Sequence, residues 1–315
     1  MSTLAVPPFL TNPRQDAIDL YKAFKGFGCD SAAVINILAH RDATQRALIQ
    51  QEYKAMYSAE LTNRLSSELS GNLKARDNIF IKHIFHELDA TVLREALCGV
   101  IDLYAATEII CSRTPSQIQT IKQIYHAKFG VHLEHDIRYQ ASGDHQKLLL
   151  AYIGTGRYEG HEVDPHKASK DAKDLFKAGE RRLGTDEKTF IHIFSERSRA
   201  QLAAVASYYD HTYGNKLEKV IIYYLINLFF LRACLSLCAE NPAKYFAKVL
   251  RKAMKGLGTN DTALVRVVVT RTEIDMQYIK VEYHKKYKKH LHDAIHSETS
   301  GHYRTFLLSL VGSHA

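Results

Sequence analysis

Four copies of one pattern run through this chain of 315 residues and constrain its fold more than any other feature. Each copy has an Arg, a Tyr 12 positions later and a Leu 8 positions after that, and the surrounding segments align without gaps. The Arg-to-Arg steps are 72, 84 and 74 residues, too long for one solenoid turn, so each copy is expected to be a small helical bundle. The triplets are Arg41, Tyr53, Leu61; Arg113, Tyr125, Leu133; Arg197, Tyr209, Leu217; and Arg271, Tyr283, Leu291.

The apolar residues within a copy recur at steps of three, four and seven, which is the spacing of amphipathic helices. Convincing strand alternation is absent from the sequence, so we predict an all-α protein. The longest connector, residues 154–169, is rich in Gly, Pro and polar residues and divides the chain into two halves. The expected organisation is an amino-terminal arm at 1–10, copies at 11–82 and 83–154, a linker at 155–164, and copies at 165–237 and 241–312.

The repeated Arg and Tyr are interpreted as scaffold residues. An Arg just past a helix end can donate hydrogen bonds to the carbonyls left open there. A Tyr can bury its ring while its hydroxyl finds a partner. These residues therefore identify the repeat and not an activity.

Copies one and four also share a glycine loop and a distant acidic residue. The segments AFKGFGCD at 23–30 and AMKGLGTN at 253–260 place Gly28 and Gly258 at equivalent positions, and Glu68 and Glu298 each follow 40 residues later. A KGxG turn leaves carbonyls pointing outward, because glycine adopts the φ values that such a turn needs. Carbonyls with one bidentate carboxylate supply the oxygen ligands that calcium prefers. The pattern predicts two discontinuous calcium sites.

With these motifs the chain resembles the annexin family over essentially its whole length. The short amino-terminal arm, the AHR at 39–41 and the IICSRTP at 109–115 are most similar to plant annexins. The resemblance implies four homologous five-helix repeats in a slightly curved disc, with calcium loops on the convex side. It further implies calcium-dependent binding to anionic phospholipid membranes.

The expected ligands and membrane contacts follow from the two motifs and the resemblance. Loop carbonyls and one carboxylate are expected to hold calcium in each site, and lipid phosphate oxygens are expected to complete its shell. The loop-tip apolar residues are expected to enter the headgroup boundary or to pack back on their own repeat, and the loop lysines to face phosphates. The calcium ligands are Phe24, Gly26, Gly28 and Glu68, and Met254, Gly256, Gly258 and Glu298; the membrane contacts are Lys25, Phe27, Lys255 and Leu257.

The middle copies are expected to lack such sites. Copy two has no glycine loop and carries Gln140 at the acidic position, where one neutral amide oxygen replaces a bidentate carboxylate. Copy three retains the loop GERRLGTDE with Gly184 in register, but Tyr224 occupies its acidic position. Weak binding by the carbonyls of that third loop remains an alternative.

Composition limits the class of partner. The formal charge of +8 and the pI near 9.1 predict attraction to polyanions. The densest basic segment, residues 280–296, is interpreted as a solvated helix face or as a contributor to membrane-surface charge. No nucleic-acid partner is expected, because the sequence has no zinc finger, helix-turn-helix or RNP motif.

The sequence also favours a location and a state. It opens with neither a basic leader nor a long apolar stretch, which favours the cytoplasm, with peripheral membrane association when calcium rises. Five cysteines without a CxxC fit reduced thiols better than a disulfide framework. A monomer in solution is expected, and the cytoskeleton is allowed as a further partner.

Three features leave rival functions open, although no enzyme is expected. His40 is interpreted as a packed or capping histidine, or as a haem ligand, because it lies at a position discussed for haem peroxidase activity in plant annexins. Cys111 with Cys238 matches a pair proposed there for redox chemistry. Burial as small apolar residues is the alternative for the cysteines. The run VIIYYLINLFFL at 220–231 is interpreted as a buried helix pair or as a membrane element that conducts ions.

Overall fold

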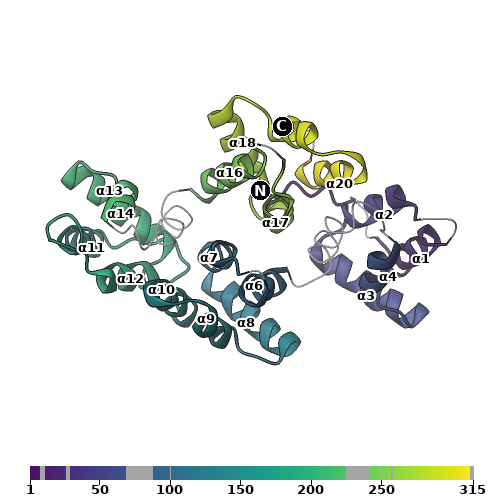
Figure 1. Ribbon diagram of the computed structural model, residues 1–315, viewed down its shortest axis with the longest axis horizontal. Coiled ribbons are helices and arrows are strands. Elements are labelled where there is room, and N and C mark those ends of the chain that lie inside the picture. The colour runs from purple at the N-terminus through teal and green to yellow at the C-terminus, as the bar shows by residue number, and fades with distance from the viewer. Residues whose placement is uncertain are drawn as a thin grey trace. The chain divides into compact units, whose positions relative to one another are not determined.

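The computed structural model describes residues 1–7, 11–25, 29–68, 88–99, 101–224, 241–256 and 258–312. Every regular element within those residues is an α-helix, which confirms the predicted all-α class (Figure 1). The chain forms two compact units, one of Met1–Leu88 with Phe246–Ala315 and the other of Asp89–Tyr245. Copies one to four are called repeats 1 to 4 below.

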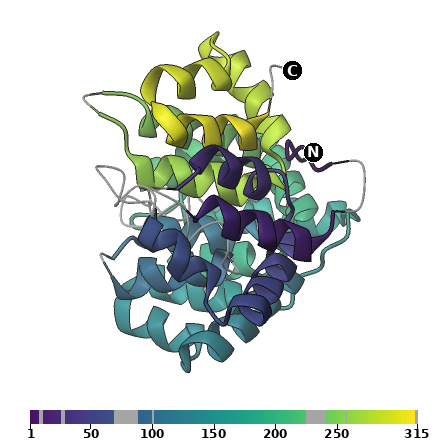
Figure 2. The same ribbon diagram turned by 90° about the vertical axis from the view of Figure 1, so that its right-hand side faces the viewer.

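The first unit joins the two ends of the chain. Helix α1 packs on α2 and α3, α17 packs on α20, and α2 packs on α20, so repeats 1 and 4 lie side by side, purple and yellow in Figure 2. Repeat 1 contributes α1 (Pro13–Ala23), α2 (Ser31–Leu38), α3 (Ala43–Tyr57) and α4 (Leu61–Glu68); repeat 4 contributes α16 (Pro242–Ala253), α17 (Asp261–Thr272), α18 (Met276–Tyr287), α19 (Leu291–Glu298) and α20 (Gly301–Val311).

The amino-terminal arm is bound to repeat 4. Thr3 donates from its backbone N–H to the Thr272 carbonyl at 3.0 Å and from its hydroxyl to the Leu310 carbonyl at 2.7 Å. The Gln277 N–H donates to the Met1 carbonyl at 3.1 Å. These bonds hold the first residues beside α17 and α20, where Figure 1 places the N label near α17.

The second unit holds repeats 2 and 3. Helix α11 packs on α12 and α13, and α10 packs on α7, α9 and α12. Repeat 2 has five described helices, as repeat 4 does, and repeat 3 has four described helices, as repeat 1 does. The helices are α6 (Leu88–Cys98), α7 (Leu103–Ser112), α8 (Pro115–Phe129), α9 (Leu133–Gln140), α10 (Gly143–Gly154), α11 (Pro165–Ala178), α12 (Glu187–Glu196), α13 (Arg199–Tyr213) and α14 (Leu217–Tyr224).

The repeated tyrosines are core residues, as predicted. Tyr53, Tyr125, Tyr209 and Tyr283 are each at most 1% exposed. The Tyr209 hydroxyl donates to Glu180 Oε1 at 2.7 Å, and the Tyr125 hydroxyl donates to Asp136. The ring is therefore buried while the hydroxyl of these two residues reaches a carboxylate.

The repeated arginines differ from the prediction in their main partner. Arg41 does donate to the His40 carbonyl at 3.0 Å, but its guanidinium also pairs with Asp16 of α1, at 2.7 Å. Arg113 pairs with Asp89 at 2.5 Å and Arg197 with Asp171 at 2.6 Å in the same way. The aspartate is preferred because a carboxylate on the first helix accepts two charge-assisted bonds from the guanidinium.

In repeat 4 the buried arginine, Arg271, contacts different residues. Phe246 stands where the other repeats carry the aspartate, seven residues before an alanine in the last turn of the first helix. Arg271 lies over the Phe246 ring at 4.5 Å and pairs with Asp275 at 2.6 Å. The buried arginine is thus kept while its first-helix partner changes from a carboxylate to an aromatic face.

Two expectations meet the structure in part. Val220 and Ile221 in α14 are 3% and 1% exposed, as a buried run requires, whereas residues 225–231 lie outside the described residues. Within the described helices, none is long and apolar enough to cross a membrane.

Cys111 is fully buried but disulfide-bonded, so the expectation of reduced thiols is wrong for this residue. Cys238 lies outside the described residues.

Candidate functional site

The loop between the first and second helices is held by the same two hydrogen bonds in all four repeats. A side chain at the N-cap of the second helix accepts from its first turn, while the backbone N–H of the same residue donates to an alanine carbonyl of the first helix. The N–H to carbonyl bonds run at 2.9 Å in repeats 1 to 3, from Asp30 to Ala23, from Asp102 to Ala96 and from Asp186 to Ala178. In repeat 4 the bond runs at 2.8 Å from Asn260 to Ala253. The loops therefore start and end alike but differ in length. Compared with the loops of repeats 1 and 4, the loop of repeat 2 is one residue shorter and that of repeat 3 is one residue longer.

In repeat 4 the loop depends on its glycines. Gly256 has φ +123° and Gly258 has φ +88°, and a Cβ at either position would meet nothing within 4 Å. Conformation, and not space, therefore requires glycine at both positions. Met254 is 3% exposed and anchors the start of the loop, while Lys255, Gly256 and Gly258 are exposed.

The structure brings this loop to the predicted acidic residue. The Thr259 hydroxyl donates to the backbone carbonyl of Glu298 at 3.3 Å, across 39 residues of sequence. Glu298 is the last residue of α19 and is exposed. Exposed loop backbone therefore lies beside the helix end that carries the exposed Glu298, and carbonyl and carboxylate oxygens suit a hard cation.

Repeat 1 shows a related arrangement with one difference. Phe24 caps α1 and is 2% exposed, and its carbonyl accepts from Arg64 Nη2 at 3.3 Å. This bond places α4, which ends at Glu68, beside the loop. Lys25 is exposed, and its ammonium lies 5.1 Å above the Tyr21 ring. One predicted ligand oxygen therefore already accepts a hydrogen bond from a cation.

Several predicted site residues cannot be placed. Gly26, Phe27, Gly28 and Leu257 lie outside the described residues, as does the side chain of Glu68. Their roles as ligands or membrane contacts therefore stay predictions.

Repeat 2 fills the equivalent region with a polar cluster. The carboxylate of Asp136 on α9 accepts from Arg94 and Tyr125, and from the Cys98 thiol at 3.5 Å. Burial opposes ionisation of Asp136, but the hydrogen bonds from Tyr125, His135 and Arg94 outweigh it and lower its pKa. Burial and the bond to Asp136 raise the pKa of Tyr125. The carboxylate of Asp136 therefore already has several hydrogen-bond donors, and the absence of a calcium site in repeat 2 stays a prediction.

Repeat 3 keeps the loop, but an acidic residue within that loop, Glu180, is bound by other side chains of the repeat. Glu180 stands where repeats 1 and 4 have the loop lysine, and its carboxylate accepts from Tyr209 at 2.7 Å and from Asn215 at 2.8 Å. Gly184 has φ +80°. Leu183 just before it is fully exposed, at 103% of the reference area. The side chain of Tyr224 lies outside the described residues.

Two residues at these sites were not singled out from the sequence. Thr259 and Arg64 each bond a backbone carbonyl, and such bonds leave no motif. A comparison of the copies does flag Arg64, because Ala294 stands at the same place in repeat 4.

The haem and metal alternatives gain no support from the described residues. His40 donates from Nδ1 to the Asn36 carbonyl at 2.9 Å, which is the packed arrangement that caps a helix end. In the part of the chain that the structure describes, no group of three or more His, Cys, Asp or Glu is arranged to hold a metal ion.

Fold and loops together define an all-helical protein of four homologous repeats, in which a glycine loop meets an acidic helix end in repeat 4. The annexin family model matches residues 15–75, 88–152, 170–225 and 245–310. The chain is 51% identical over 314 residues to annexin D5 of Arabidopsis thaliana, covering 99% of each chain. The chain belongs to the annexin family, which is known for calcium-dependent phospholipid binding.

Solved structures agree with this assignment. The fold matches annexin III with a TM-score of 0.92 at 35% identity, covering 100% of this chain and 98% of that one. It matches a calcium-bound annexin (Sm)1 with a TM-score of 0.82 at 26% identity, covering 99% and 93%.

Proposed function

We propose that this annexin binds anionic phospholipid membranes when calcium is present, through one site in repeat 4 and one in repeat 1. The observation that carries the proposal is the meeting of the loop and Glu298 through Thr259. The family assignment and the calcium-bound relative support the choice of cation.

In repeat 4 the carbonyls of Met254, Gly256 and Gly258 and the carboxylate of Glu298 would hold the ion. The positive φ values of both glycines and the exposed carboxylate fit a hard cation that takes oxygen ligands. When bound, calcium would supply positive charge and open coordination positions for lipid phosphate oxygens.

In repeat 1 the corresponding ligands would be Phe24, Gly26, Gly28 and Glu68. Arg64 already donates to the Phe24 carbonyl, and its positive charge competes with calcium for that oxygen. We therefore propose that repeat 1 needs more calcium than repeat 4.

Four loop residues would contact the lipid. Phe27 and Leu257 would enter the headgroup boundary, and Lys25 and Lys255 would face phosphates. The exposed position of Leu183 at the matching place in repeat 3 supports the tip role. Exposure of Lys25 and Lys255 supports the phosphate role.

The protein would be a cytoplasmic monomer that associates peripherally with membranes as calcium rises, with the cytoskeleton as a further partner. No nucleic-acid partner or enzymatic activity is proposed.

The test is sedimentation with phosphatidylserine vesicles and with phosphatidylcholine vesicles, each in calcium and in chelator. We expect strong binding only to phosphatidylserine in calcium. The single variant Glu298→Gln should raise the calcium midpoint more than Glu68→Gln does. Binding to phosphatidylserine that is equal in calcium and in chelator would overturn the proposal.

A further inference from the structure

The corner between the third and fourth helices carries a facing pair of side chains that differs among repeats. The pair consists of the residue after the buried tyrosine and the residue before the buried leucine. Repeat 1 has an ion pair there, with 2.5 Å between ammonium and carboxylate, whereas repeats 2 and 4 have stacked imidazoles with centroids 4.1 and 4.3 Å apart. The pairs are Lys54 and Glu60, His126 and His132, and His284 and His290.

Repeats 2 and 4 share the stacked histidines but differ in the charge around them. In repeat 2 the ammonium of Lys122 lies 2.5 Å from the carboxylate of Glu134. The equivalent residues of repeat 4 are Lys280 and His292, so a base replaces the acid. Lys285 adds a further positive charge where repeat 2 has an alanine. The corner of repeat 4 is therefore strongly basic.

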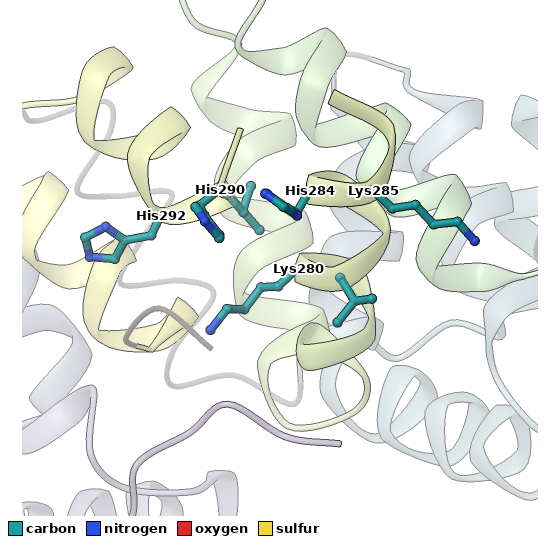
Figure 3. A pocket seen from close by; sticks show the side chains of 7 residues that line it. Lys280, His284, Lys285, His290 and His292 are labelled. Atoms are coloured by element: carbon teal, nitrogen blue, oxygen red, sulfur yellow. The ribbon is translucent and has the colours of Figure 1, made fainter. Parts of the chain in front are cut away.

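A cavity of about 430 Å³ opens at this corner of repeat 4. Figure 3 shows His284 beside His290, with the Lys280 side chain extending toward the side on which His290 and His292 lie and that of Lys285 extending away. The described residues that line it, none of them acidic, are Lys280, Val281, His284, Lys285, His290, Leu291 and His292.

These groups suit a multiply charged anion. An ammonium and several imidazoles offer charge-assisted hydrogen bonds to oxygen, which are stronger than neutral ones. Burial lowers the pKa of Lys280, and an anion bound beside its ammonium would favour the charged form. Asp293 is adjacent, with Oδ1 3.7 Å from His292 Nδ1, and gives a protonated His292 one carboxylate neighbour.

We propose that this cavity between α18 and α19 binds a phosphate group carrying two or more negative charges, without calcium. The ligand would be a diphosphate or phosphomonoester, either free or on a lipid headgroup. The site shares no lining residue with the calcium loop of repeat 4, and the proposal stands apart from the proposed calcium function.

The test uses the full chain in chelator, with inorganic pyrophosphate by calorimetry and with vesicles of phosphatidylcholine containing a phosphatidylinositol phosphate by sedimentation. His292→Glu recreates the ion pair of repeat 2, and Lys280→Gln removes the central ammonium. Each should weaken binding about tenfold or more, because each removes a charge-assisted contact. Lys122→Gln makes the same charge change at the matching place of repeat 2 and should leave binding unchanged.

Binding in either arm that falls in His292→Glu and Lys280→Gln but not in Lys122→Gln supports the proposal. Binding of pyrophosphate alone identifies a free phosphate compound as the source, and binding of the vesicles identifies the headgroup. The proposal is overturned if neither pyrophosphate nor the vesicles bind, or if Lys122→Gln weakens binding as much as the two variants of repeat 4 do. Circular dichroism of each variant separates loss of binding from loss of fold.

Discussion

Repeats 2 and 4 have the same five helices and yet present different chemistry at two places. At the first loop, repeat 4 has glycines at positive φ and an exposed Glu298, whereas repeat 2 has a shorter loop and the Asp136 cluster. At the corner of the third and fourth helices, repeat 2 has the Lys122 and Glu134 pair, which Lys280 and His292 replace in repeat 4. The comparison teaches that the core of the repeat fixes the backbone while a few surface substitutions decide what each copy can bind.

The largest effect is expected from the buried arginine of repeat 2. Arg113→Met leaves Asp89, whose side chain is 16% exposed, without its guanidinium. Breaking a buried pair in this way costs about 3 to 5 kcal/mol of stability. Urea denaturation should show a clearly lower midpoint.

The matched control is Lys147→Gln, which removes an exposed pair with Asp144 at 2.8 Å. It should change stability by about 0.5 kcal/mol or less. A loss in Arg113→Met no larger than in this control would show that the pair is not what holds the repeat.

Acid should destabilise repeat 2 through His145, where repeat 4 has Tyr303. Burial lowers the pKa of His145 to about 4, and its Nε2 lies 2.9 Å from the Thr107 hydroxyl. The folded state therefore binds this proton less well than the unfolded state, whose histidine titrates near 6.5. The contribution of neutral His145 to stability is therefore fully present above about pH 6.5 and is lost as the pH falls toward about 4. The total loss is up to about 3 kcal/mol.

Denaturation midpoints between pH 7.5 and pH 4 measure this effect. His145→Gln, whose amide can still bond Thr107, should flatten the part of the curve that His145 causes. The same acid slope in the variant and in the parent would assign the destabilisation to other groups.

The loop glycines of repeat 4 should matter less for stability than for binding. Gly258→Ala forces a side chain into φ +88°, which costs on the order of 1 kcal/mol. It should also raise the calcium midpoint for vesicle binding. Gly154→Ala, at an unstrained helix end with nothing within 4 Å, should do neither. If the two variants behave alike, the loop conformation is not the reason for glycine.

The smallest effect is expected at Thr259, where repeat 2 has Ile101. Thr259→Val keeps the shape and removes the bond to the Glu298 carbonyl, worth about 1 kcal/mol or less. A small rise in the calcium midpoint, with unchanged helicity, is the expected result. A midpoint identical to that of the parent would show that this bond does not position Glu298.

Much of the fold could be predicted from the sequence because the repeat marks its own core. The tyrosines at fixed spacing are buried in every copy, and the N-cap residues of the second helices, Asp30 and its equivalents, are visible as polar residues before apolar runs. The pairing of Arg41 with Asp16 was missed, because partners 25 residues apart on different helices leave no local pattern.

The candidate site could be predicted only in part. The spacing of 40 residues located Glu298 and its loop, since a repeat shows which residues must meet. The bonds of Thr259 and Arg64 to backbone carbonyls depend on loop conformation and could not be predicted. The basic corner at Lys280 appeared in the sequence only as a charged run, because its cavity forms when two helices pack.

The most direct test of the central claim is the calcium midpoint for phosphatidylserine vesicle sedimentation of the double variant Glu68→Gln with Glu298→Gln. The change keeps side-chain size and removes a bidentate ligand from each site. We expect most calcium-dependent binding to be lost while helicity stays unchanged, and we expect Glu218→Gln, outside both sites, to bind like the parent. A double variant that sediments at the parent's calcium midpoint would contradict the assignment of both sites.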